Sequence, residues 1–138
     1  MILCKEPNHG SDPSFMETRS YYDASTKEYL LNGSKNWITN SPIADAFIAL
    51  ARNKDGNIKG YLTEKGTPVL DAPKIKEKKS LHASATGIIF MDYVRIPASH
   101  ELDMTGPKGP FGCLNNARFV IAWGALGAME DCLHHARG

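Results

Sequence analysis

The chain has 138 residues, of which 42% are hydrophobic and 22% are charged, a balance typical of one ordinary globular domain. Its 16 basic and 15 acidic residues are interspersed and leave a net charge of +1, which argues against a nucleic-acid-binding surface. The three cysteines show neither CxxC nor zinc-ligand spacing, so a reducing compartment without a metal ribbon is favoured, and no run is apolar enough to predict a signal peptide or membrane span.

The first part of the chain is predicted to consist of short strands. The start, MILCKEP, already has strand character at residue 1. The runs at 17–24 and 28–33 predict a hairpin, because turn-forming residues separate two segments of β-forming composition. Asn32-Gly33 is a further turn signal, after which we expect SKNWIT at 34–39 to continue as a strand.

Three later stretches complete the predicted β region. The segments 46–53 and 58–64 flank a Lys-Asp-Gly-Asn turn and predict a second hairpin. TPVLDAP at 67–73 is short and bounded by prolines, which suits an edge strand, and 85–97 is the longest strand candidate. We therefore predict a mainly β fold of packed antiparallel sheets over residues 1–110.

The composition changes near residue 106, where GPKGP predicts a linker or a helix lead-in. From Phe111 onward, apolar or small residues recur every three or four positions, which predicts one long helix. These residues are Leu114, Ala117, Ile121, Ala125, Ala128 and Cys132. A single helix has few partners in an otherwise β chain, so we expect 111–138 to belong to a larger helical unit.

Candidate chemistry is sparse when the residues are taken alone. Gly10-Ser11 in EPNHGSD could hold a phosphate with backbone amides and a hydroxyl, although such loops are usually only turns. Glu6 and Asp12 could form a carboxylate pair, with capping and turn roles as the alternative. The histidines lack metal-ligand spacing, and the adjacent pair at 134–135 points to two helix faces, which favours solvated side chains over a metal site.

KNWITNSPIAD at 35–45 poses a sharper question. Trp37, Ile38 and Thr39 have β-forming character, and the Asn-Ser-Pro that follows is typical of a turn. A bulky indole at a strand end either packs into the core or forms an aromatic wall for a ligand, with a hydroxyl beside it. The residues alone leave both interpretations open.

Four motifs occur together and in order: EPNHGSDPSFMETR at 6–19, LNGSKNWITNSPIAD at 31–45, SLHASATG at 80–87 and GPFGCLNNARFVIAWGALGA at 109–128. This set resembles the flavin-containing acyl-CoA dehydrogenases, and within that family the glutaryl-CoA branch. The resemblance covers essentially the whole chain. It implies that residues 1–110 form the family's middle β domain and 111–138 the first helix of an incomplete carboxy-terminal α domain.

The resemblance also implies an FAD site. Trp37 would wall the isoalloxazine ring, while the Ile38 backbone and the Thr39 hydroxyl would hydrogen-bond toward flavin N5. The segment 2–11 would contribute the remaining contacts, with Cys4 and Lys5 at the ring and Gly10 and Ser11 near the pyrophosphate. Lys5 is a departure, because the family normally has a threonine there. Its ammonium would lie at the pyrimidine edge of the flavin or swing out to solvent.

The same resemblance implies an acyl-CoA site and a parent activity. Ser11 would approach the acyl-CoA, together with five helix residues: Ala117, Arg118, Phe119, Trp123 and Gly124. The family's catalytic glutamate would lie beyond Gly138, and the arginine that grips the distal carboxylate would lie before Met1. We therefore assign no catalytic residue and no metal ligand here.

Two functions follow from this resemblance. In the first, the chain is the flavin- and acyl-CoA-binding fragment of a glutaryl-CoA dehydrogenase that is inactive by itself. Its parent would convert glutaryl-CoA to crotonyl-CoA in the mitochondrial matrix as a homotetramer, and pass electrons to electron-transferring flavoprotein. In the second, the chain is a non-enzymatic interaction module that keeps only the family scaffold. Flavin absorbance of the purified chain would separate the two.

Overall fold

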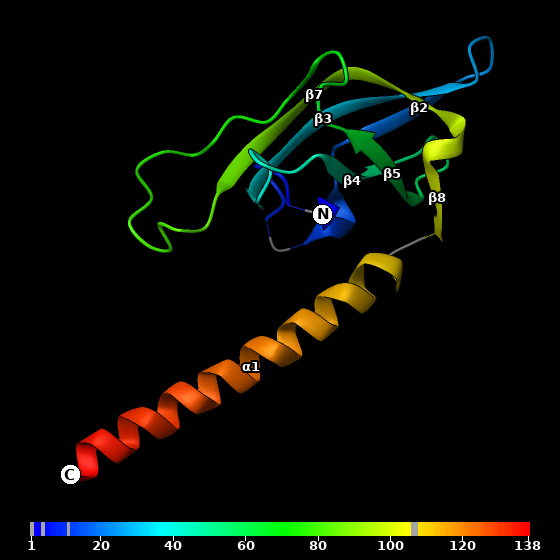
Figure 1. Ribbon diagram of the computed structural model, residues 1–138. Helices are drawn as coiled ribbons and strands as arrows, with labels where there is room; N and C mark the ends of the chain where they lie inside the picture. Colours follow the sequence, from blue (N-terminus) through cyan, green and yellow to red (C-terminus); the bar gives the residue numbers. More distant parts are fainter. Residues whose placement is uncertain (1, 4, 11, 106–107) are drawn as a thin grey trace. The chain divides into compact units, whose positions relative to one another are not determined.

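The computed structural model describes residues 2–3, 5–10, 12–105 and 108–138, and the chain divides into two compact units, Met1–Gly106 and Pro107–Gly138 (Figure 1). Among the described residues, the first unit contains eight strands of one continuous sheet. They are β1 (Ile2–Leu3), β2 (Arg19–Asp23), β3 (Glu28–Thr39), β4 (Ala46–Arg52), β5 (Ile58–Glu64), β6 (Leu70–Asp71), β7 (Thr86–Pro97) and β8 (Glu101–Thr105). Two short 3₁₀ helices, Pro13–Phe15 and Ala98–His100, lie between strands.

The sheet folds over on itself around a narrow junction. Its strand order is β6-β7-β3-β2-β4-β5-β8, with β1 on β4, and most neighbours are antiparallel. The junction between β2 and β4 rests on a single register pair, Arg19 with Arg52. Two wings result, and Figure 1 shows β3 and β7 lying over β4 and β5. The predicted mainly β fold of packed antiparallel sheets is confirmed.

Apolar side chains from both wings form the core. Along β4 and β7, buried positions alternate with more exposed ones over much of the strand, as expected for strands with one covered face. The buried cluster comprises Leu31, Ile38, Phe47, Ala49, Ala51, Tyr61, Ile89, Met91, Val94 and Ile96. Because these residues come from β3, β4, β5 and β7, burying them requires the two wings to close together.

Most local predictions hold, and one is wrong. Both hairpins, the edge strand at Leu70–Asp71 and the long strand at Thr86–Pro97 are confirmed. Asn32-Gly33, however, is not a turn, because β3 continues through it with a register shift against β7. A Cβ at Gly33 would lie 2.6 Å from Thr18 Oγ1, and the Gly33 φ is +148°. The glycine therefore serves a β-bulge and a close approach rather than a turn.

Two short strands were missed by the sequence reasoning or given no partner. β1 pairs in parallel with β4, and β8 pairs antiparallel with β5. β8 is secured at its first residue, where Glu101 accepts a hydrogen bond from the Tyr29 hydroxyl and pairs with Lys59 Nζ at 3.1 Å. β1 has only two residues and carries no pattern, whereas ELDMT in β8 alternates polar and apolar residues, a strand signal that the sequence reasoning did not use.

The second unit is the helix α1 (Lys108–Arg137). Large apolar side chains are exposed along it: Phe119, Val120, Ile121, Trp123, Leu126, Met129 and Leu133. Three of them are consecutive and therefore occupy different faces of the helix, the pattern of a helix that packs inside a larger helical unit. Within the described part of the chain, no helix combines the length and apolar character needed to cross a membrane.

Candidate functional site

The end of β3 presents an exposed indole. Trp37 is 56% exposed, whereas its neighbour Ile38 is buried at 5%. The Trp37 φ is +56°, a left-handed conformation that is rare for a bulky residue, and it coincides with a register shift between Lys35 and Ile38. The Trp37 N–H donates a hydrogen bond of 2.8 Å to Asn36 Oδ1. The structure therefore excludes a core tryptophan within this unit, and the aromatic wall stays a prediction.

The Thr39 hydroxyl lies on a firmly anchored strand end. Thr39 is exposed, as Trp37 is, and the buried Ile38 lies between them in the sequence. The Asn40 N–H donates to the Ala85 carbonyl at 2.6 Å, and Ser41 Oγ donates to the Ile38 carbonyl at 3.1 Å. These bonds hold the turn that follows and keep Thr39 in place.

Glu6 is buried beside this strand and is fully engaged. Its carboxylate accepts hydrogen bonds from Lys35 Nζ at 2.7 Å, from the Thr18 hydroxyl, and from the N–H groups of Glu17 at 2.6 Å and Thr18 at 3.0 Å. Burial by itself would raise the pKa of Glu6, but the Lys35 charge and these hydrogen bonds outweigh it and lower that pKa. Glu6 is therefore a carboxylate held in its charged form and a poor general base.

The segment that follows β1 runs along β3 at the bulge. The Asn36 N–H donates to the Lys5 carbonyl at 3.0 Å, and Lys5 itself is exposed. Glu6 and His9 exchange backbone hydrogen bonds of 3.3 and 3.4 Å, so the segment turns back on itself before the exposed Gly10. The bond to Lys5 places its backbone beside Asn36, the residue that precedes the predicted Trp37, Ile38 and Thr39.

Other predictions for this segment have mixed outcomes. Asp12 accepts the Ser14 N–H at 2.8 Å, and Glu6 pairs with Lys35, so the turn interpretation holds for Asp12 and no carboxylate pair forms. The predicted contacts of Cys4 and Ser11 lie outside the described residues. Sequence reasoning missed the roles of Lys35 and Asn36. A lysine inside an otherwise β-forming run was the one available signal.

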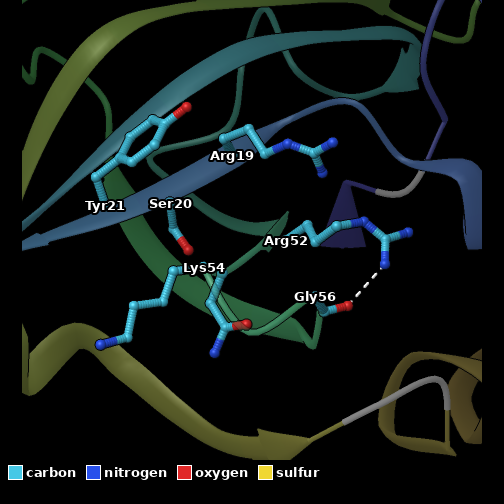
Figure 2. A pocket seen from close by; sticks show the side chains of 7 residues that line it. Arg19, Ser20, Tyr21, Arg52, Lys54 and Gly56 are labelled. Atoms are coloured by element: carbon cyan, nitrogen blue, oxygen red, sulfur yellow. Dashed lines mark hydrogen bonds between the residues drawn. The ribbon is translucent and has the colours of Figure 1, made fainter.

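An open hollow of about 330 Å³ lies where β2 meets β4 (Figure 2). It is lined by Arg19, Ser20, Tyr21, Arg52, Asn53, Lys54 and Gly56. In the described part of the chain, none of its three cations forms an ion pair with a carboxylate. The guanidinium groups instead donate to the backbone carbonyls of Ser14, Met16 and Gly56. Figure 2 shows Arg19 and Arg52 extending in the same direction, with Lys54 pointing away from them. We assign these two arginines a structural role at the junction.

The five predicted substrate residues lie on α1 and are described by themselves. All are exposed on the helix, where Phe119 and Trp123 form an edge-to-face pair with centroids 6.2 Å apart. Arg118 donates a hydrogen bond of 3.0 Å to Asn115 Oδ1. At 3.6 residues per turn, Ala117 and Gly124 fall on one side of the helix and the aromatic pair on the other. A single ligand bound to one side of the helix would therefore contact some of the five residues and not the others.

Comparison with known proteins identifies the family. The profile described as "Acyl-CoA dehydrogenase, middle domain" matches residues 2–94. The chain belongs to the acyl-CoA dehydrogenase family. This confirms the resemblance seen in the four sequence motifs and the fold predicted from it.

Solved relatives support the glutaryl-CoA branch. A glutaryl-CoA dehydrogenase from Mycobacterium smegmatis has a TM-score of 0.88 and 43% identity, covering 96% of this chain and 34% of that one. A glutaryl-CoA dehydrogenase from the same organism, in complex with FADH2, has a TM-score of 0.86 and 44% identity, covering 92% and 32%. One solved relative thus holds a flavin, which agrees with the cofactor expected from the resemblance.

A curated relative agrees with the family assignment. Glutaryl-CoA dehydrogenase of Desulfococcus multivorans is 33% identical over 138 residues, covering 95% of this chain and 35% of the relative. The chain therefore spans about a third of the length of the relatives it matches. The mitochondrial location remains a prediction, because these relatives are bacterial.

Proposed function

We propose that this chain is the flavin- and acyl-CoA-binding middle part of a glutaryl-CoA dehydrogenase. The observation that carries the proposal is the exposed Trp37, held in a left-handed conformation beside the exposed Thr39 and the Lys5 segment. An exposed large apolar side chain is a candidate for a binding surface. The left-handed conformation does not single out Trp37, because the exposed Val69, Leu81 and Tyr93 share it. The 44% identity to a relative with bound FADH2 supports a flavin as the ligand.

The residues present fit an FAD molecule. Trp37 offers an apolar face to a planar ring, and the Thr39 hydroxyl can donate or accept a hydrogen bond at its edge. The exposed Gly10, with Ser11 after it, would receive the pyrophosphate. When bound, FAD supplies the two-electron acceptor for oxidation of the acyl group.

The chain's own residues would shape this site rather than perform a proton transfer. Trp37 would exclude water from the ring and orient it, and Thr39 would tune its electron affinity through a hydrogen bond. Lys5 would add a positive charge near the ring, which favours a reduced anionic flavin. Glu6 is committed to Lys35, so it leaves the role of general base to a carboxylate elsewhere in the proposed parent.

We further propose that α1 packs within the helical domain of that parent. Its exposed apolar side chains need such a partner, and its Arg118 would meet the CoA moiety. The parent would assemble as a homotetramer in the mitochondrial matrix, convert glutaryl-CoA to crotonyl-CoA and pass electrons to electron-transferring flavoprotein. We propose that the chain alone is inactive, because Glu6, the buried carboxylate beside the site, is already paired with Lys35.

A non-enzymatic interaction module is the second candidate. One point favours it: Lys5, which is exposed, stands where the resemblance implies a threonine. The two candidates differ in flavin binding. The first requires that Trp37 and Thr39 bind the flavin ring, whereas an interaction module does not require it.

Titration of FAD into the purified chain tests the proposal. Trp123→Phe leaves Trp37 as the single tryptophan, so flavin binding near it would quench its emission. We expect a dissociation constant in the micromolar range or weaker by order of magnitude, because one face of the cofactor would stay uncovered. Thr39→Ala should weaken binding by about 0.5–1.5 kcal/mol, roughly two- to twelvefold.

The control for this titration is Cys132→Ala, on an exposed position of α1. It should leave the affinity unchanged. A chain that shows no quenching, or an equal response of the two variants, would overturn the flavin site and leave the interaction module.

A further inference from the structure

Glu6 and Lys35 form an ion pair that is almost completely buried. The Lys35 side chain is 0% exposed and that of Glu6 is 2% exposed. Burying such a pair does not by itself stabilise a fold, because the desolvation of both charges offsets their attraction and an apolar pair of similar volume often does as well. The position of the pair in the structure therefore needs another reason.

The pair connects the amino-terminal segment to β3 immediately before Trp37. Glu6 holds Lys35 through the side chains, and the preceding residue of the segment, Lys5, accepts the N–H of Asn36, the next residue of the strand. Asn36 in turn accepts the N–H of Trp37 through its side chain. Each of the residues 35, 36 and 37 is thus held by a named contact.

These contacts explain how Trp37 keeps a conformation that its own chemistry disfavours. A left-handed φ for a bulky residue persists only when its surroundings determine it. Glu6 also binds the N–H groups of Glu17 and Thr18, so it joins three stretches of chain at one carboxylate. We infer that Glu6 and Lys35 are positioning residues that set the orientation of Trp37 at the cofactor site, an inference that rests on the proposed flavin function.

The test uses the full chain carrying Trp123→Phe, so that Trp37 alone fluoresces. One variant combines Glu6→Gln with Lys35→Met, which removes the pair without leaving a buried charge and keeps an acceptor for Thr18. Tyr61→Phe is the matched control, because it removes a buried hydrogen bond of 2.7 Å to Ser20 elsewhere in the core. Each protein is measured for urea unfolding, for acrylamide quenching of Trp37, and for FAD affinity.

We expect the double variant to unfold cooperatively but to show a shifted emission maximum and altered quenching of Trp37. Its affinity for FAD should fall about tenfold, by analogy with the lower end of the loss measured when the groups that orient metal ligands are replaced. Tyr61→Phe should lower the stability, while the emission and quenching of Trp37 and the affinity for FAD stay as in the Trp123→Phe chain.

Two results would overturn the inference. One is a double variant that loses only stability, with unchanged Trp37 quenching and FAD affinity. The other is a Tyr61→Phe control that changes the emission and quenching of Trp37 as much as the double variant does. General destabilisation would then be the cause. If the Trp123→Phe chain with the pair intact binds no FAD, the proposed function is refuted instead. Acrylamide quenching of Trp37 would then decide by itself whether the pair positions Trp37.

Discussion

Replacing Lys35 with methionine should be among the most destabilising single substitutions in this chain. The change leaves the Glu6 carboxylate at 2% exposure without its cation, and breaking a buried pair in this way costs about 3–5 kcal/mol. Three hydrogen bonds to Glu6 remain, from Glu17 and Thr18, so we expect the lower end, about 3 kcal/mol. For a unit of this size, that corresponds to a fall in melting temperature of roughly 12 °C or more.

An exposed ion pair between β7 and β3 provides the comparison. Arg95 lies 3.0 Å from Glu28, with side chains 52% and 32% exposed. Arg95→Gln removes this pair and the 3.6 Å contact of Arg95 with Asp23, and it should cost about 0–1 kcal/mol because water screens these charges. Urea unfolding of both variants and of the Glu6→Gln/Lys35→Met pair measures the difference, and the double variant should recover part of the loss. Equal costs for Lys35→Met and Arg95→Gln would refute the reasoning that burial makes the pair expensive to break.

Four further predictions follow from particular contacts. Gly33→Ala should cost more than about 1 kcal/mol in urea unfolding, because its Cβ would meet Thr18, whereas Gly127→Ala in the open helix should not destabilise. The pKa of Glu6 is lowered in the folded state. Its contribution to stability is therefore present above its unfolded pKa of about 4.5 and is lost as the pH falls through the lower folded pKa. Glu6→Gln should reduce the pH dependence of stability in that range, as monitored by circular dichroism during acid unfolding. The chain should purify colourless, and flavin absorbance that survives gel filtration in stoichiometric amount would contradict the expected weak affinity. It should not oxidise glutaryl-CoA with an artificial electron acceptor, and turnover above a boiled control would show that a base is present after all.

Much of the fold was predictable because its signals are local. Turn residues between β-forming runs located both hairpins, and the spacing of apolar and small residues located the helix. These features depend on a few neighbouring residues, whose preferences read directly from the sequence. The resemblance carried by the four motifs implied the packed β domain and an exposed position of Trp37 at a ligand.

The tertiary structure decided the features that depend on residues far apart in sequence. Asn32-Gly33 has the composition of a turn, yet Thr18 packs against the glycine and makes it a bulge within a continuous strand. The residues alone favoured a core position for Trp37, yet the strand has a register shift there and the indole is exposed. Glu6 meets Lys35 across 29 residues because the segment after β1 is held against β3, and no periodicity records such a pairing. Local preference determines which elements form, whereas burial and hydrogen bonding between elements determine which side chains face the solvent at the site.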